Sequence, residues 1–305
     1  MNILFLGASS FTGFHFVNEL SKIKKNKIYC TLTKNINQYR SIRYERIKLL
    51  SKKKNIIFLK KIKFGDKKFI NLLKQIKFDI FCFHHAFTKD YNDNSKFKFQ
   101  KSIKENTKNI HEVFKLIDFK SLIIISNTIF QDIPTKKYKA VNNYGISKSN
   151  SFNQIKYYCK KNNIKYRSIY ITNPWGVYEE KKLNYYLIKN WFDNKNAHIS
   201  HPNYIRDNIY IDKLSQSYKR VILSKSNKVD FFPSGICSSN KVFIEALKKK
   251  FEKFFKKKAK VTYANCAIYN QPICRINGDR INKKVKIEQN LSKYFLYYKK
   301  NLLVN

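Results

Sequence analysis

The chain has 305 residues, 43% of them hydrophobic, and a formal charge of +43 from 63 Lys and Arg against 20 Asp and Glu. This length suffices for a large α/β domain with a smaller lobe, and the apolar content excludes a disordered chain. No stretch approaches about 18 consecutive apolar residues and no basic leader opens the chain, so we expect a cytoplasmic protein without a membrane span.

Short apolar runs alternate with helical stretches along the first half of the chain. In chain order, the sequence predicts a strand over Ile3–Leu6, a helix over Phe11–Ile23, strands over Lys27–Leu32 and Asn55–Leu59, a helix over Lys67–Ile76, a strand over Asp79–Phe83, a helix over Phe97–Ile117, a strand over Leu122–Ser126 and a helix over Ser147–Lys161. Buried parallel strands between helices are the simplest arrangement of such a pattern. We therefore predict an α/β fold with a doubly wound parallel sheet, the architecture of nucleotide-binding domains.

A glycine-containing turn, Gly7-Ala8-Ser9-Ser10-Phe11-Thr12-Gly13, joins the first strand to the first helix. It keeps the ends of a Gly-x-x-Gly-x-x-Gly frame but has Ser10 in the middle, where the backbone approaches a pyrophosphate. The β-carbon of Ser10 would weaken binding or shift the phosphates, although its hydroxyl could donate a hydrogen bond. The residues expected to bind a dinucleotide here are Gly7, Ser9, Ser10, Phe11 and Gly13.

The pentad Tyr144-Gly145-Ile146-Ser147-Lys148 follows a strand that ends in a hydroxyl residue, Ser126. A Tyr and a Lys four residues apart on a helix share one face, so the ammonium would favour the ionised phenol and lower its pKa from about 10 toward 7. We interpret the pair as an acid/base couple. The same spacing recurs, without the preceding strand, where we expect only a surface Tyr beside a Lys: at Tyr44, Tyr157, Tyr178 and Tyr185.

The positive charge is spread over every segment, together with abundant Asn, Ile, Tyr and Phe, as A/T-rich codon usage would produce. The densest run, Lys248–Lys260, alternates lysines with Leu247, Phe251, Phe254 and Phe255 at helical spacing. We interpret this run as the two faces of one helix rather than a binding patch, and do not expect nucleic acid as a partner.

The cysteines contain no Cys-x-x-Cys pair, and several fall inside predicted strands, where a thiol behaves as a small apolar side chain. We therefore expect no metal site and no disulfide. The six cysteines are Cys30, Cys82, Cys159, Cys237, Cys266 and Cys274.

Taken together, these motifs resemble those of the extended short-chain dehydrogenases/reductases, in the NAD-dependent epimerase/dehydratase branch that acts on nucleotide sugars. Two further segments, Asn173-Pro174-Trp175-Gly176 and Arg206-Asp207-Asn208-Ile209-Tyr210-Ile211-Asp212, resemble the family's Asn-Pro-Tyr-Gly and Arg-Asp-Phe-Val-Tyr-Val-Asp stretches. The similarity covers nearly the whole chain. It implies a Rossmann-like domain over 1–170, to which about 206–230 returns, and a smaller substrate-binding lobe over 171–305.

The resemblance also implies roles for single residues. Tyr144 would be the acid/base for a sugar hydroxyl or carbonyl, and Ser126 would orient that oxygen. Lys148 would hold the nicotinamide ribose and lower the tyrosine pKa. Asn173 would lie near the nicotinamide and the substrate, and Arg206 near the substrate diphosphate, which suits a guanidinium donor. This agrees with the chemistry, because hydride transfer requires a proton to move on the same oxygen.

The end of the second strand bears on the choice of cofactor. The family usually has a carboxylate there that binds the adenosine ribose, whereas this chain has Thr33-Lys34-Asn35, with Arg40 and Arg43 beyond. A missing acid and nearby bases favour a 2′-phosphate. We therefore expect NAD or NADP, with a lean to NADP and a contact at Lys34.

The strand over Asp79–Phe83 ends in His84-His85-Ala86, where the family has small residues. Paired histidines suggest a metal ion, but no third ligand is evident in the sequence. We favour packing beside the cofactor.

Two reactions stay open. Dehydratases of the family carry Thr-Asp-Glu where this chain has Ser126-Asn127-Thr128, so it lacks the acid and base for water elimination. The remaining choices are epimerisation through a keto intermediate and reduction of a 4-keto sugar. The competing hypothesis is a catalytically inactive dinucleotide-fold protein that binds RNA through its basic surface.

Family members often dimerise through the helix that bears the tyrosine, so we also expect a homodimer. Phe152, Ile155 and Tyr158 would serve that contact or pack in the core, and the sequence leaves both readings open.

Overall fold

The computed structural model describes residues 1–265, 269–287 and 291–302. Contacts divide the chain into two compact units, one of Met1–Ile171 and Ser215–Phe232, the other of Thr172–Leu214 and Pro233–Asn305. The segment that returns to the first unit thus starts at Ser215, later than the residue near 206 expected from the sequence. Cys266 lies outside the described residues.

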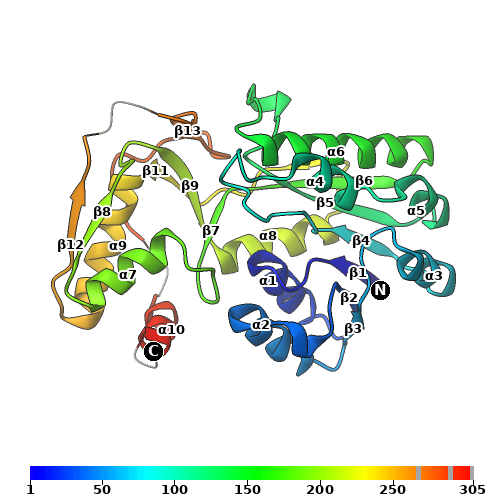
Figure 1. Ribbon diagram of the computed structural model, residues 1–305, viewed down its shortest axis with the longest axis horizontal. Coiled ribbons are helices and arrows are strands. Elements are labelled where there is room, and N and C mark those ends of the chain that lie inside the picture. The colour runs from blue at the N-terminus through cyan, green and yellow to red at the C-terminus, as the bar shows by residue number, and fades with distance from the viewer. Residues whose placement is uncertain (266–268, 288–290, 303–305) are drawn as a thin grey trace. The chain divides into compact units, whose positions relative to one another are not determined.

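The first unit is built on a seven-stranded parallel sheet with the strand order β10-β6-β5-β4-β1-β2-β3 (Figure 1). This order confirms the predicted doubly wound parallel sheet, because the chain winds outward from β1 in both directions. The strands are β1 (Asn2–Leu6), β2 (Lys27–Leu32), β3 (Ile56–Lys60), β4 (Ile80–Phe83), β5 (Leu122–Thr128), β6 (Lys165–Ile171) and β10 (Asp230–Phe231).

Helices cover both faces of this sheet (Figure 1). They are α1 (Phe11–Leu20), α2 (Ser41–Ser51), α3 (Lys67–Gln75), α4 (Phe99–Asn106), α5 (Ile110–Leu116), α6 (Asn143–Lys161) and α8 (Ile211–Leu223), with short 3-10 turns η1 (Ile36–Gln38) and η2 (Pro134–Lys136). Residues of α3, α5 and α6 pack in one cluster with Leu4 and Leu6. The side chain between them, Phe5, lies near Tyr218 of α8, which stacks on Phe16 of α1. Both faces are buried, which explains why the strands are continuously apolar.

The side chains proposed for a dimer contact pack on the core of this unit. Ile155 is buried within the cluster, and Phe152 and Tyr158 pack against it. The core-packing interpretation therefore accounts for all three.

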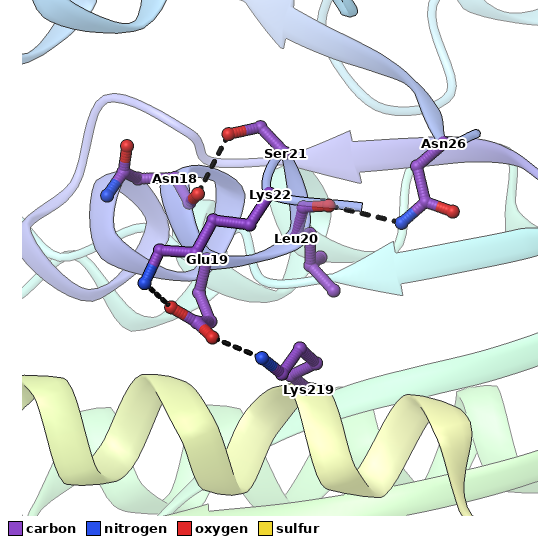
Figure 2. Close-up of polar contacts among 7 residues, drawn as sticks. All are labelled: Asn18, Glu19, Leu20, Ser21, Lys22, Asn26 and Lys219. Carbon is purple, nitrogen blue, oxygen red and sulfur yellow. Dashed lines mark hydrogen bonds and ion pairs between the residues drawn. The ribbon is translucent and has the colours of Figure 1, made fainter. Parts of the chain in front are cut away.

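A buried carboxylate ties the returning helix α8 to α1. Glu19 is only 6% exposed and forms ion pairs with Lys22 and with Lys219 of α8 (Figure 2). Burial raises the pKa of Glu19, but the hydrogen bonds and charges of Lys219 and Lys22 outweigh it and hold the pKa below its usual value. The ionised carboxylate thus stabilises the contact between helices far apart in sequence.

The second unit has its own sheets and core. In its four-stranded sheet, β9 lies between β11 and β13 and also pairs with β7, while β8 and β12 form a separate pair. A cluster rich in aromatic residues, including Trp191, Phe251 and Tyr294, fills this unit. Its elements are β7 (Asn173–Trp175), α7 (Leu183–Phe192), β8 (Asn196–Ile199), β9 (Ile205–Tyr210), β11 (Ile236–Ser239), α9 (Asn240–Phe255), β12 (Lys260–Tyr263), β13 (Cys274–Arg275) and α10 (Ser292–Leu302).

The lysine-rich run lies mostly on α9, whose Leu247 and Phe251 are fully buried. The helix ends at Phe255, with Lys256 in the left-handed conformation, and Lys260 begins β12. The run is therefore a helix face followed by a turn, not one continuous helix. Within the described residues, no helix is both long and apolar enough to cross a bilayer.

Candidate functional site

The turn after β1 is held by its two end glycines and a serine cap. Ser10 caps α1: its hydroxyl donates to the carbonyl of Gly7 (2.9 Å) and accepts from the N–H of Gly13 (3.1 Å). Gly7 has a φ of +88°, and a β-carbon there would lie 2.9 Å from the carbonyl oxygen of His84. A β-carbon on Gly13 would lie 2.3 Å from the carbonyl oxygen of Gly7. Both ends therefore require glycine, whereas Ser10, with a φ of −72°, sits without strain and uses its hydroxyl as a cap.

This turn fits the phosphates of a dinucleotide. The N–H groups of Phe11 and Thr12, in the first turn of α1, have no acceptor within the helix, and the helix dipole adds positive potential there. Beneath the turn, the fully buried Arg46 of α2 donates to the carbonyl oxygen of Ser9 (3.1 Å) and lies 5.7 Å from the Phe11 ring. No sequence motif singles out Arg46, because its burial depends on how α2 packs.

The residues considered for a 2′-phosphate lie after β2. Lys34 is exposed, as are Arg40 and Arg43. The guanidinium of Arg40 donates to the backbone carbonyls of Asn37 and Tyr39, so part of its donor capacity is already used. Lys34 thus offers an exposed cation two residues beyond the strand, with no hydrogen bond or ion pair to another described residue.

Tyr144 lies in the first turn of α6, which begins four residues before the predicted start. Asn142 caps the helix by accepting from the N–H of Gly145 (2.9 Å), and its amide donates to the carbonyl of Tyr91 (3.0 Å). The Tyr144 ring packs edge-on against Tyr91 (5.4 Å) and Phe97 (6.1 Å). Burial, with a further contribution from Tyr91, raises the pKa of Tyr144. The sequence predicted the opposite direction.

The ammonium of Lys148, which was expected to lower the pKa of Tyr144, bonds to strand β5 instead. Lys148 is buried, and its ammonium donates to the backbone carbonyl of Ser126 (2.8 Å). Burial lowers the pKa of Lys148 to about 8. Among the described residues, no hydrogen bond joins the Tyr144 hydroxyl to Lys148 or Ser126. The structure therefore brings Lys148 and Ser126 together, and directs the ammonium to the strand rather than to the phenol.

The histidine pair after β4 is engaged by other side chains. Nδ1 of His84 lies 2.7 Å from Oγ of Ser126, and its Nε2 lies 2.9 Å from Oγ1 of Thr12. Burial, with the charges of Lys148 and His85, lowers the pKa of His84 to about 3. His85 stacks on Phe64 and its Nε2 lies 3.2 Å from the carbonyl oxygen of Asn106, a contact in which the ring nitrogen donates. In the part of the chain that the structure describes, no three His, Cys, Asp or Glu residues are grouped for a metal ion.

The two predicted substrate contacts lie in the second unit. Asn173 is a half-buried residue of β7. Arg206 of β9 is 7% exposed and its guanidinium donates to the carbonyls of Ile205 (2.9 Å), Pro272 (3.2 Å) and Ile273 (2.8 Å). It also lies 4.3 Å from the Tyr204 ring. The other terminal nitrogen of Arg206 donates to the side-chain oxygen of Gln271 (3.4 Å). Arg206 is thus held within its own unit, and only the N–H groups not used in these bonds remain for a ligand.

No protein-family model matches the sequence, and no curated protein matches it at the sequence level. Solved structures do match in three dimensions. UDP-glucuronic acid 4-epimerase from Bacillus cereus, in complex with UDP-glucuronic acid and NAD, has a TM-score of 0.75 at 17% identity, covering 99% of this chain and 100% of its own. UDP-glucose 4-epimerase from Thermotoga maritima, with UDP-glucose, has a TM-score of 0.70 at 15% identity, covering 99% and 100%.

A third match is dTDP-glucose 4,6-dehydratase from Bacillus anthracis in complex with NAD, with a TM-score of 0.72 at 15% identity, covering 99% of this chain and 97% of its own. The likeness extends over both units in all three cases. The chain therefore has the fold of the extended short-chain dehydrogenases/reductases, as represented by epimerases and dehydratases of nucleotide sugars.

Proposed function

We propose that the chain is an NAD(P)-dependent nucleotide-sugar epimerase or 4-ketoreductase in which Ser126, Tyr144 and Lys148 act on one sugar carbon and its oxygen. The observation that carries this proposal is the bond from the buried ammonium of Lys148 to the carbonyl of Ser126. It joins two of the three residues, from α6 and β5, in the same unit as the glycine turn. A buried cation held at the residue that bears the hydroxyl is suited to stabilising an oxygen that gains or loses a proton.

The cofactor would be held by the first turn of α1. Gly7 and Gly13 allow the backbone to approach the pyrophosphate, the N–H groups of Phe11 and Thr12 would donate to it, and Ser9 lies on the same turn. We propose NADP rather than NAD as the preferred cofactor, because Lys34 is exposed after β2 and no carboxylate ends that strand. When bound, the nicotinamide would supply the acceptor or donor of hydride.

Tyr144 would transfer the proton. Because burial raises its pKa, the phenol holds its proton at neutral pH, which is the form that donates to a ketone oxygen as hydride arrives at the carbon. This state suits the ketoreductase. An epimerase must also remove a proton from the sugar hydroxyl, which requires additional stabilisation of the phenolate.

The substrate class follows by analogy with the structural neighbours, two of which were solved with UDP-glucuronic acid and UDP-glucose. We propose a nucleoside-diphosphate sugar, with Asn173 near the reacting end and the remaining donors of Arg206 near the diphosphate. The Ser126-Asn127-Thr128 sequence supplies no carboxylate for water elimination, so dehydration is not expected.

The test replaces the proposed proton donor. Tyr144→Phe removes one hydroxyl and should lower kcat about 10²- to 10⁴-fold in a screen of UDP- and dTDP-sugars with NAD or NADPH. The matched control is Tyr157→Phe, which alters an exposed tyrosine on the same helix with a lysine at the same spacing. Tyr157→Phe should retain full turnover. Full turnover by Tyr144→Phe would refute the proposal.

We further propose that the protein is a homodimer. Since Ile155 is part of the core, the contact would involve the outer face of α6, where Tyr157 is exposed. Light scattering of the purified protein measures the mass directly.

A further inference from the structure

One imidazole bridges the glycine turn and the proposed catalytic serine. His84 follows β4 directly, and β4 lies between β1 and β5 in the sheet. The carboxyl end of β4 therefore separates the turn after β1 from Ser126 near the end of β5. His84 spans this gap, with Nε2 at 2.9 Å from Thr12 and Nδ1 at 2.7 Å from Ser126.

The surroundings of the ring keep it neutral and in place. Phe5 and Phe16 pack against it, with ring centroids at 5.6 Å and 5.2 Å, and Tyr218 lies at 6.5 Å. Burial and the charge of Lys148 both disfavour the imidazolium, which lowers the pKa of His84 to about 3. A neutral imidazole has one N–H donor and one acceptor nitrogen. His84 therefore donates to one of its two partners and accepts from the other.

The two tautomers differ in what they leave to Ser126. If Nδ1 carries the hydrogen, His84 donates to Ser126 and accepts from Thr12, and the hydroxyl hydrogen of Ser126 remains available for another acceptor. If Nε2 carries the ring hydrogen, the Ser126 hydroxyl must donate to Nδ1, and its hydrogen is then not available to a substrate oxygen. A serine that orients a sugar oxygen has to donate to that oxygen as charge develops on it.

We propose that His84 is a positioning residue, held by Thr12 in the Nδ1–H tautomer so that the Ser126 hydroxyl donates to the substrate oxygen. This inference rests on the proposed function of Ser126. On this proposal, the orientation of the Ser126 hydroxyl depends on Thr12, which lies in the first turn of α1, where the phosphates would bind.

The tautomer can be measured without substrate. The ¹⁵N shifts of a sample labelled in the histidine rings distinguish the two tautomers, and the His84 signals are identified by their loss in His84→Gln. The wild-type protein should show Nδ1–H at His84. Thr12→Val, which removes only the hydroxyl, should give a mixture of both tautomers. An Nε2–H tautomer in the wild-type protein would overturn the proposal.

Two substitutions separate the nitrogens in kinetics. The amide of His84→Asn can take the place of Nδ1 and donate to Ser126, whereas the longer His84→Gln places its amide near Nε2. We expect His84→Asn to retain most of kcat and His84→Gln to lower kcat about ten- to a hundredfold with little change in KM. Adding Ser126→Ala to His84→Gln should cause no further loss. Equal effects of Asn and Gln, or independent losses in the double variant, would indicate a purely structural histidine.

His85→Asn is the matched control, since His85 contacts Asn106 rather than Ser126. Thermal denaturation of every variant separates loss of folding from loss of orientation. The readouts also separate this inference from the function on which it rests. An Nδ1–H tautomer in a protein without turnover would count against the proposed function, whereas turnover with an Nε2–H tautomer would count against the role of His84 alone.

Discussion

Glu179 is a buried acid that the proposed chemistry does not use. It lies in the second unit, between β7 and α7, and accepts hydrogen bonds from the hydroxyls of Tyr294 (2.9 Å) and Tyr298 on α10. Burial raises the pKa of Glu179 to about 7, against the opposing effects of Tyr298, Tyr294, the N–H of Gly176 and the charge of Lys182. Tyr210 also faces this carboxyl. The side chain therefore titrates near neutral pH.

This pKa predicts how stability depends on pH. Between the ordinary glutamate pKa and about 7, the folded chain holds a proton that the unfolded chain has released, so the free energy of unfolding falls as pH rises through that window. Glu179→Gln cannot lose a proton there. The change in unfolding free energy between about pH 5 and about pH 8 should be up to roughly 3 kcal/mol smaller in Glu179→Gln than in the wild-type protein.

Urea denaturation at both pH values measures this difference. Glu112→Gln, on the exposed side of α5, controls for the change of charge alone. Parallel pH dependence of Glu179→Gln and the wild-type protein would contradict the assignment of a raised pKa to Glu179.

At the level of elements, the start of α6 is fixed by close contact between its backbone at Gly145 and the backbone of Phe130. A β-carbon on Gly145 would lie 2.0 Å from the carbonyl oxygen of Phe130, and that same oxygen accepts from the N–H of Val141 (2.8 Å). The loop after β5 is thus pressed against the first turn of α6, next to Tyr144. The glycine is required by this contact, not by its backbone angles.

Gly145→Ala should therefore destabilise the protein, although alanine normally favours a helix. We expect the free energy of unfolding to fall by about 1–3 kcal/mol, because the loop or the helix must move. Turnover should fall as well, since Tyr144 moves with the turn. Chemical denaturation checks the first effect, and Asn150→Ala, at an exposed position of α6, is the control. A stabilised Gly145→Ala would show that the loop yields at no cost.

The sequence predicted β1 to β5 closely, because runs such as Leu122–Ser126 are mostly apolar and β-branched. It did not predict β6 and β10. It missed α2, whose buried face includes Arg46 beside Ile47 and Leu50 and so lacks a clear apolar stripe. The helix predicted over Phe97–Ile117 is two helices, α4 and α5, because Asn109 takes the left-handed conformation at the break.

The motifs singled out Ser126 and Lys148 as site residues, because a tyrosine pentad after a strand is a local pattern, but they did not predict the bond from the Lys148 ammonium to the Ser126 carbonyl. The bond between His84 and Ser126 was not predicted. It depends on β4 and β5 being neighbours in register, which no local pattern specifies. The predicted lowering of the Tyr144 pKa was wrong for a similar reason, since Tyr91 and Phe97, which pack against the ring, come from a segment far from the pentad in sequence.

On the scale of the whole molecule, the charge of +43 opposes the compact state, because cations repel one another more strongly when the chain is folded. Salt screens exposed charges over a Debye length of about 10 Å at 0.1 M. Raising NaCl from about 0.01 M to about 0.5 M should therefore raise Tm.

Differential scanning calorimetry at constant pH measures this shift. Sucrose at matched osmolality separates screening from preferential exclusion. An unchanged or lower Tm in salt would mean that ion pairs such as that of Glu19 with Lys219 outweigh the net repulsion.

The return of the chain to the first unit also sets an order of events on the ribosome. Strand β10 completes the sheet beside β6 about 60 residues after Ile171, and α8 brings Tyr218 onto Phe16 about 45 residues after it. At translation rates of about 5–20 residues per second, β6 has no strand beside its outer edge until β10 is synthesised, about 3 to 12 s later. During that interval an unpaired strand and an uncovered aromatic face are available to chaperones or to other nascent chains.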